Sequence, residues 1–441
     1  MNVFSKYKNL GENKKKVISN VGWATSGRII RLLTETLVGI FVARYLGPSQ
    51  YGLMNYVISY VSLFMIIASF GLENIEIREL ANPNSSRDKI LGTAFCLRLF
   101  FSIITIICIG LLLFFSETDY ESSLLILIYS LTVILSSFNV IRNYFTSIVM
   151  NKYIVITEIV RCLIGASIKV ALLFVHAPLI WFIIALTFDY FLVAGGYIGA
   201  YKNKVGTFKS WCFDKIIAKK LIIEAFPLLL SGAAVIVYQK IDQVIIKNLL
   251  DNEHVGYFSV AAKFSELILF IPLVMSQTVA PLLVKEKMLD QERYRVRKQY
   301  FVDVVLWTTL ICTVCLSLVA YPLIRYTYGI EYMAAVPVLH VMAFKAVGMA
   351  LSNSSGQIII IEGKQKYAVI RNLVGCILCV SCNYLLIPVY GIIGSAWATI
   401  VTVIGSGFIC NAFIPSYRDV FRIQINAIIS GSYRLLKKTK R

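Results

Sequence analysis

Apolar residues occur along this chain in long runs that are separated by short polar segments. A run of about 20 apolar residues is long enough for one helix to cross a lipid bilayer. On this pattern we predict twelve transmembrane helices, at residues 17–46, 51–70, 90–115, 122–141, 153–175, 178–201, 221–248, 256–284, 299–324, 335–361, 367–387 and 391–414. The first run is too long for a cleavable signal peptide and has no small-residue cleavage site, so we expect it to remain as a helix.

Turn-forming residues stand between several of these helices. Glycine and proline occur together at 46–48 and 388–391, and proline follows a polar or small residue at 82–84 and 176–178. Such residues end helices, so we expect the chain to break at these four places. The polar stretch 353–357 interrupts the tenth helix, and it is either the wall of a cavity or an unwound hinge.

The composition agrees with a chain that lies in lipid. Of the 441 residues, 58% are hydrophobic and 15% are charged, and the mean hydropathy is +0.74. Soluble domains contain about 25% charged residues. The fold class that we predict is therefore an all-α polytopic membrane protein, without a large soluble domain.

The net charge of +19 indicates how the chain is oriented in the membrane. It does not indicate a nucleic-acid partner. Lys and Arg gather in the loops on one side of the predicted membrane, and the opposite loops hold only Arg325. Because basic loops stay in the cytoplasm, both termini are expected there. The basic tail 415–441 has an apolar run that is too short to span, which favours a cytoplasmic or interfacial position.

The two halves of the chain carry similar motifs. Ser26-Gly27 precedes a long helix, a break and Tyr51-Gly52, and Ser231-Gly232 precedes Val255-Gly256 in the same arrangement. Six helices per copy predict parallel repeats, related by a pseudo-twofold axis along the membrane normal. The domains expected are a basic N-terminus at 1–16, a six-helix lobe at 17–201, a basic linker at 202–220, a second lobe at 221–414 and the tail at 415–441.

Ordinary enzyme and metal motifs are missing from the sequence. It has three histidines and no HExxH, Walker or GxGxxG pattern, and nine of its ten cysteines stand inside apolar runs. Small apolar packing explains such cysteines better than metal binding. We therefore expect a transporter rather than an enzyme, with no bound metal or cofactor.

Eighteen charged residues fall within the predicted spans, 11 of them basic and 7 acidic. Each costs roughly 2.5–3.5 kcal/mol at the centre of a lipid-facing helix. Arg44 and Lys247 lie near helix ends and can reach the headgroups. The others require a polar interior or partners, and three same-helix pairs offer such partners: Arg31–Glu35, Glu158–Arg161 and Lys263–Glu266. The surplus of bases suits an anionic substrate.

Three groups of short motifs are spread along the chain. The first is Arg44-Tyr45-Leu46-Gly47-Pro48 with Tyr51-Gly52 and Asn55-Tyr56. The second is Phe226-Pro227, Ser231, Ile241-Asp242-Gln243 and Gly256-Tyr257 with Ala261. The third is Asn383-Tyr384-Leu385-Leu386-Ile387-Pro388 with Tyr390-Gly391, Gly394-Ser395-Ala396 and Ala398-Thr399. From about residue 18 to 414 the chain thus resembles the O-antigen flippase (Wzx-type) group of the multidrug/oligosaccharidyl-lipid/polysaccharide exporter superfamily.

The resemblance implies a V-shaped bundle of two lobes around a cationic cavity. It also implies a location in the bacterial inner membrane and transport of undecaprenyl-diphosphate-linked oligosaccharide to the periplasmic leaflet by alternating access, coupled to H⁺ or Na⁺. Membrane lipids, a polysaccharide polymerase and a chain-length regulator are the partners that it suggests. The basic pair Arg28 and Arg31 looks like the first-helix motif of lipid II flippases. Some relatives have fourteen helices, whereas this pattern gives twelve.

Two sets of residues follow as site hypotheses. The residues expected to hold the diphosphate and any acidic sugar are Arg28, Arg31, Arg98, Arg161, Lys263 and Lys345. Those expected to bind the coupling cation are Glu35, Asp242 and Glu266. Two other functions remain open. A drug exporter of the same fold would need surplus acid in its cavity, and a membrane glycosyltransferase would need long external loops, which this sequence lacks.

Overall fold

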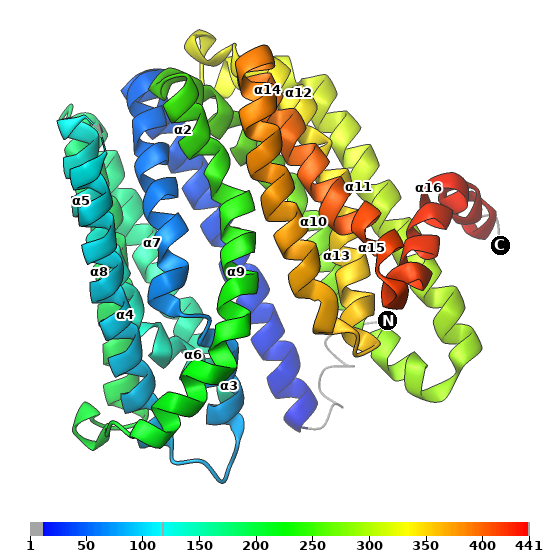
Figure 1. The fold of residues 1–441 in the computed structure, drawn as a ribbon, viewed down its shortest axis with the longest axis horizontal. Coiled ribbons are helices and arrows are strands. Elements are labelled where there is room, and N and C mark those ends of the chain that lie inside the picture. The colour runs from blue at the N-terminus through cyan, green and yellow to red at the C-terminus, as the bar shows by residue number, and fades with distance from the viewer. Residues whose placement is uncertain (1–11, 117–118, 440–441) are drawn as a thin grey trace. The chain divides into compact units, whose positions relative to one another are not determined.

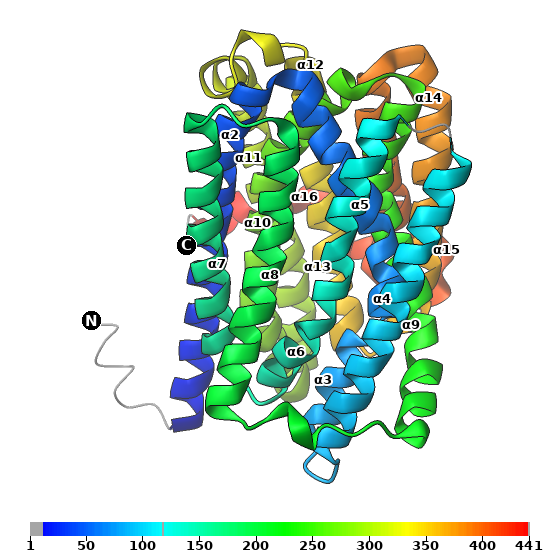
Figure 2. The same cartoon turned by 90° about the vertical axis from the view of Figure 1, so that its left-hand side faces the viewer.

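The computed structural model describes residues 12–116 and 119–439, and all regular secondary structure in these ranges is helical. Figures 1 and 2 show the arrangement of the helices. Their bounds are α2 Glu12–Ser69, α3 Glu73–Ala81, α4 Arg87–Phe115, α5 Tyr120–Leu135, α6 Asn139–Ser147, α7 Asn151–Phe174, α8 Leu179–Lys204, α9 Lys215–Leu249, α10 Asn252–Leu289, α11 Gln291–Thr327, α12 Ala335–Ala343, α13 Lys345–Ile361, α14 Ala368–Ile404, α15 Cys410–Phe413 and α16 Arg418–Thr439. The predicted all-α class is confirmed.

Nine segments of the described residues are long and apolar enough to cross a membrane. Two of them, Ile30–Ala81 and Gln365–Phe413, contain 52 and 49 residues. At 1.5 Å per residue each is more than twice as long as a bilayer core of about 30 Å, so each holds two crossings. The helix α7 carries the charged residues Glu158, Arg161 and Lys169, and its 24 residues, about 36 Å, are long enough for a further crossing. The predicted number of about twelve is thereby accounted for in this multi-pass membrane protein.

The predicted breaks fall where the backbone departs from helical geometry. Gly47 has φ 71° and ψ 172° within α2, and Gly391 has φ 58° and ψ −142° within α14. Positive φ is a conformation that glycine adopts without steric cost, which is why these kinks stand at glycines. The helix α3 ends at Ala81 and α8 begins at Leu179, as the prolines at 83 and 178 predict.

The structure rules out one of the two alternatives for the polar stretch in the tenth predicted helix. The polar stretch 353–357 lies within the continuous helix α13, so an unwound hinge at this place is wrong. The irregular turn lies elsewhere, in a π-helix at Gly405–Ile409 after α14. Two short helices, α3 and α6, lie largely in connections between the long helices, where hydropathy predicts no helix.

The first of two compact units contains residues 1–45 and 60–232. Its helix α8 packs against both α5 and α7, and α4 packs against α5. The buried core of this unit joins Leu72 and Ile75 around α3 to aromatic residues of α8, Tyr197 and Tyr201. The short helix α3 is therefore part of the core and not a loop.

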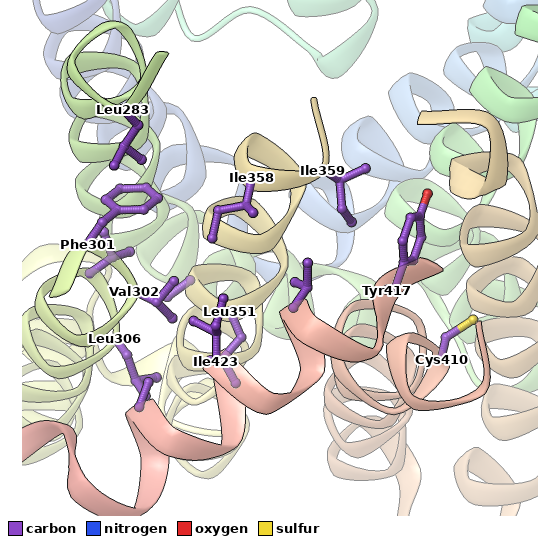
Figure 3. Packing of buried hydrophobic residues seen from close by; sticks show 14 of the residues in the cluster. Leu283, Phe301, Val302, Leu306, Leu351, Ile358, Ile359, Cys410, Tyr417 and Ile423 are labelled. Atoms are coloured by element: carbon purple, nitrogen blue, oxygen red, sulfur yellow. The ribbon is translucent and has the colours of Figure 1, made fainter. Parts of the chain in front are cut away.

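The second unit contains residues 46–59 and 233–441. Its helix α10 packs against α11, α12 and α13, and α11 packs against α16. Figure 3 shows the buried cluster in which Phe301 and Leu306 of α11 meet Leu351 and Ile358 of α13 and Ile423 of α16. The C-terminal helix thus contributes to the core of this unit.

The kink after Gly47 sends residues 46–59 into the second unit. A Cβ added to Gly52 would overlap the carbonyl oxygen of Asn252, and one added to Gly256 would overlap that of Pro48. Ser59 Oγ also donates a hydrogen bond of 2.5 Å to Gln243 Oε1. The glycines of the two repeated motifs therefore allow the two backbones to touch.

The substitution Gly256→Ala is expected to destabilise the protein by about 1–3 kcal/mol, because the added methyl group meets a backbone atom that cannot rotate away. Gly110→Ala in α4 is the control, since a Cβ there meets nothing within 4 Å. Thermal unfolding in detergent should show a lower midpoint for the first variant and an unchanged or higher midpoint for the second. Equal midpoints would contradict the close backbone approach.

Candidate functional site: charged clusters within the spanning helices

Six charged side chains form a cluster between α2, α7 and α8, which we call the α2–α7–α8 cluster. Its members are Arg31, Glu35, Glu158, Arg161, Lys169 and Asp189. The two α2 residues are four apart and the first two α7 residues three apart, so each pair lies on one helix face. All six belong to the first unit.

The ion pairs in this cluster cross between helices. Arg31 Nη1 lies 2.8 Å from Glu158 Oε2, and Arg161 Nη2 lies 3.0 Å from Glu35 Oε1. The same-helix pairing of Arg31 with Glu35 and of Glu158 with Arg161 is therefore wrong. The two bridges instead tie α2 to α7, and they leave Arg31 and Glu35 partly exposed, at 33% and 41%.

The deeper end of the cluster is the carboxylate of Asp189 on α8. Lys169 Nζ donates to Asp189 Oδ2 at 2.6 Å, and Arg161 Nη1 lies 3.8 Å from the same oxygen. Gly165 leaves the space that this carboxylate occupies, because a Cβ there would overlap Asp189 Oδ1. Asp189 Oδ1 and Arg161 Nε are buried and have no hydrogen-bond partner among the described residues.

Arg28 and Arg98 occupy different environments in the same unit. Arg28 is exposed and stands one turn before Arg31 on α2. Arg98 is 3% exposed and its guanidinium donates to both carboxylate oxygens of Glu76, at 2.7 and 3.0 Å. Asn143 adds a third hydrogen bond to Glu76, at 2.6 Å. Arg98 is thus held within the core by α3.

A second polar cluster, the Asp242 cluster, lies in the second unit and consists of Asp242, Cys379, Asn383, Ser395 and Thr399. Asp242 is 3% exposed on α9. Its Oδ1 accepts from Asn383 at 2.7 Å and from the Cys379 thiol at 3.2 Å, and its Oδ2 accepts from Thr399 at 3.0 Å. Ser395 donates to Asn383 Oδ1 at 2.7 Å and fixes that amide. The residues come from α9 and from both parts of α14.

The remaining predicted residues are also in the second unit. Lys345, at the start of α13, is half-buried and acts electrostatically on Asp242. Lys263 is half-buried on α10, and Glu266 on the next turn is exposed. The structure therefore places the charge of Lys345 within electrostatic range of Asp242, and it brings Arg31 and Arg161 together in the α2–α7–α8 cluster.

Sequence reasoning did not place Arg371 among the site residues, although it is a buried cation. It is 9% exposed and donates to Ser406 O at 3.1 Å and to Ser352 Oγ at 3.2 Å. Both acceptors are neutral, and Ser406 lies in the π-helix. In the sequence, Arg371 is recognisable as an arginine in an apolar run with no acidic residue nearby. Its acceptors could not be predicted, because they come from distant segments of the chain.

The cysteines and acids of the described chain do not form a metal centre. All ten cysteines are free thiols. No group of three or more His, Cys, Asp or Glu within the described residues is arranged to hold a metal ion. The contacts within the two clusters are ion pairs and hydrogen bonds.

Comparison with known proteins gives one family and one fold. A family model described as polysaccharide biosynthesis protein matches residues 17–287. No curated protein sequence matches the chain at a significant level. The family match confirms the resemblance stated from the motifs.

Several solved membrane transporters share the fold. The lipid II flippase MurJ in an inward closed conformation has a TM-score of 0.68 at 18% identity, over 95% of this chain and 93% of that one. An inward-facing multidrug resistance MATE family transporter has a TM-score of 0.67 at 13% identity, over 94% and 99%. A MOP superfamily transporter from Pyrococcus furiosus, described as having a binding pocket of reversed polarity, has a TM-score of 0.58 at 13% identity, over 96% of both chains.

Proposed function

The chain belongs to the polysaccharide biosynthesis protein family, and on this premise we propose that it is a flippase for undecaprenyl-diphosphate-linked oligosaccharide. It moves repeat units of O-antigen or a related surface polysaccharide from the cytoplasmic to the periplasmic leaflet by alternating access. The observation that carries this proposal is the α2–α7–α8 cluster, which places arginines inside spanning helices where a charge is costly.

The diphosphate is bound by exchange of anions. In the structure, Glu158 forms an ion pair with the guanidinium group of Arg31, and Glu35 with that of Arg161. Arginine binds phosphate oxygens through two parallel hydrogen bonds, and a diphosphate carries more charge than a carboxylate. A diphosphate therefore competes with the glutamates for Arg31, with Arg28 one turn away as a second cation.

Not all predicted cations are retained in this proposal. Arg28, Arg31 and Arg161 hold the diphosphate in the first unit, while Lys263 and Lys345 supply positive charge in the second. Arg98 is left out because Glu76 and the core already occupy its guanidinium.

Asp242 binds the coupling cation, H⁺ or Na⁺. It is a buried carboxylate surrounded by hydroxyl, thiol and amide groups. Protonation or Na⁺ binding changes the charge at the contact between α9 and α14, and a cation shifts a conformational equilibrium only by its different affinity for the two states. Glu35 and Glu266 are more exposed and are weaker candidates.

Asp242→Asn should lower gradient-driven glycan transport by about tenfold or more, because coupling free energies between sites commonly correspond to factors of about 5–150. Glu266→Gln is the matched control on an exposed acid and should retain most of the activity. Flipping is measured in vesicles under an imposed Na⁺ or pH gradient. Transport by the Asp242 variant that still follows the gradient would assign coupling to another group.

The cellular setting is the bacterial cytoplasmic membrane, with both termini in the cytoplasm. A polysaccharide polymerase and a chain-length regulator use the flipped repeat unit on the periplasmic side. Protease accessibility of tags at the two termini in inverted and right-side-out vesicles tests the orientation.

The experiment for the function itself is the leaflet location of lipid-linked glycan in cells that lack this protein. We expect one repeat unit on undecaprenyl diphosphate to accumulate in the cytoplasmic leaflet, and its mass identifies the substrate. Unchanged glycan export together with a loss of resistance to cationic dyes would instead identify an exporter of drugs.

A further inference from the structure

The C-terminal helix α16 has the length of a spanning helix but not its composition. It contains 22 residues, about 33 Å at 1.5 Å per residue. It is nevertheless absent from the nine candidate spans found in the described residues. The chain turns at Ile414 and Pro415 before it, with an extended backbone at Ile414.

One face of α16 is fixed to the second unit. Ile423 and Ala427 belong to the buried cluster, as Figure 3 shows for Ile423. Gln424 is fully buried and donates to Leu351 O and Gly407 O, at 3.1 and 3.0 Å. Trp307 of α11 donates to Ala427 O at 3.0 Å. This face is therefore part of the core and not available to a partner.

An ion pair with α11 completes the attachment. Arg434 donates from Nε and Nη2 to the two oxygens of Asp303, at 2.7 and 2.8 Å. The Asp303 side chain is 1% exposed. Hydrogen bonding to this carboxylate raises the pKa of Arg434, so the guanidinium stays charged. Because Asp303 and Trp307 lie in the first half of the spanning helix α11, α16 is held against the membrane-spanning part of the protein.

The opposite face of α16 is exposed and has two parts. Ile429, Tyr433 and Leu436 are 76%, 67% and 67% exposed, at the i, i+4, i+7 spacing of a single stripe. Arg418 and Arg422 stand on the same stripe about three and two turns before Ile429, and the Arg422 side chain is 78% exposed. A stripe that is basic at one end and apolar with a tyrosine at the other matches the headgroup and acyl boundary of a bilayer.

We propose that the exposed stripe of α16 binds the anionic phospholipids of the cytoplasmic leaflet, so that α16 is an interfacial lipid-binding helix clamped to α11. Arg418 and Arg422 contact lipid phosphates, while Ile429, Tyr433 and Leu436 insert among the acyl chains. The charges are complementary, since this leaflet is negative and Arg418 and Arg422 make the first part of the stripe basic.

The test places a photoactivatable p-benzoylphenylalanine at Ile429 of the full-length protein and identifies its crosslinks by mass in native membranes. We expect adducts with phospholipid. In the control, p-benzoylphenylalanine replaces Arg295, whose side chain is 75% exposed on the first turns of α11. No lipid adduct is expected there. Adducts of the Ile429 probe with a second copy or another protein, or no adduct, would overturn the proposal.

The second arm tests the preference for charge in nanodiscs that contain equal amounts of phosphatidylglycerol and phosphatidylcholine. The Ile429 probe should label the anionic lipid preferentially. Arg418→Gln with Arg422→Gln should reduce that preference, by about fivefold per arginine if each contributes about 1 kcal/mol. Equal labelling of the two lipids before and after this change would overturn the assignment to anionic lipid. Both arms are independent of glycan transport, so their failure leaves the proposed function standing.

Discussion

Replacing Arg31 by alanine is expected to abolish glycan flipping while the protein still inserts into the membrane. In the proposed mechanism the variant loses the guanidinium that exchanges between Glu158 and the diphosphate, and it leaves Glu158 without its partner. A hydrogen bond to a charged group contributes about 1.5–3 kcal/mol, so loss of the arginine–phosphate contact corresponds to roughly tenfold or more in substrate binding. The measurement is rescue of surface polysaccharide in cells that lack the wild-type gene.

Arg44→Ala provides the matched control for this experiment. Arg44 lies on the same helix, α2, but it is exposed near the kink at Gly47. We expect this variant to restore polysaccharide to nearly the wild-type amount. Normal transport by Arg31→Ala, at equal protein level in the membrane, would show that the diphosphate site lies elsewhere.

Glu76→Ala should cause the largest loss of stability. Glu76 is fully buried and accepts hydrogen bonds from Arg98 and Asn143. Its removal leaves the buried guanidinium of Arg98 without a counter-charge, and breaking such a pair costs about 3–5 kcal/mol. Thermal unfolding in detergent and the amount of folded protein in the membrane report this loss.

Glu73→Ala is the control on the same short helix. Glu73 pairs with Arg142 at 3.2 Å, but both side chains are about half exposed, at 54% and 41%. An exposed pair contributes less than about 1 kcal/mol, so this variant should unfold at nearly the wild-type temperature. Adding Arg98→Met to Glu76→Ala should recover part of the lost stability, because it removes the unpaired charge. No recovery would indicate that α3 depends on Glu76 in another way.

The helices and their breaks were predictable because the bilayer imposes them. Backbone groups in lipid must bond within their own helix, so apolar runs become helices. Gly47 and Gly391 mark kinks since only glycine takes a positive φ without cost. The short helix α3 was not predictable from hydropathy, because its burial depends on Arg98, which lies in the following span.

The composition of the charged clusters was partly predictable, but the pairing was not. Spacing places Arg31 with Glu35 on one face of α2, and this is correct. The partner of each residue depends on how α7 packs against α2, which no local pattern contains, so the bridges formed with Glu158 and Arg161 instead. Asp242 was identified as a costly charge. Its donors Asn383 and Thr399 are uncharged and stood out only as parts of the third motif, which does not show that they bind Asp242.

The close contact at Gly52 and Gly256 bears on the order in which the protein is made. Residues 46–59 emerge from the ribosome early, while α10, whose backbone they touch, follows only after the whole of the first unit. The second unit is therefore completed only after both halves have entered the bilayer. If the chain is cut in the connection between α8 and α9, the N-terminal fragment carries residues 46–59. The C-terminal fragment needs these residues to complete the second unit. Assembly of the second unit then becomes a bimolecular step, and the yield of folded protein depends on the amounts of both fragments.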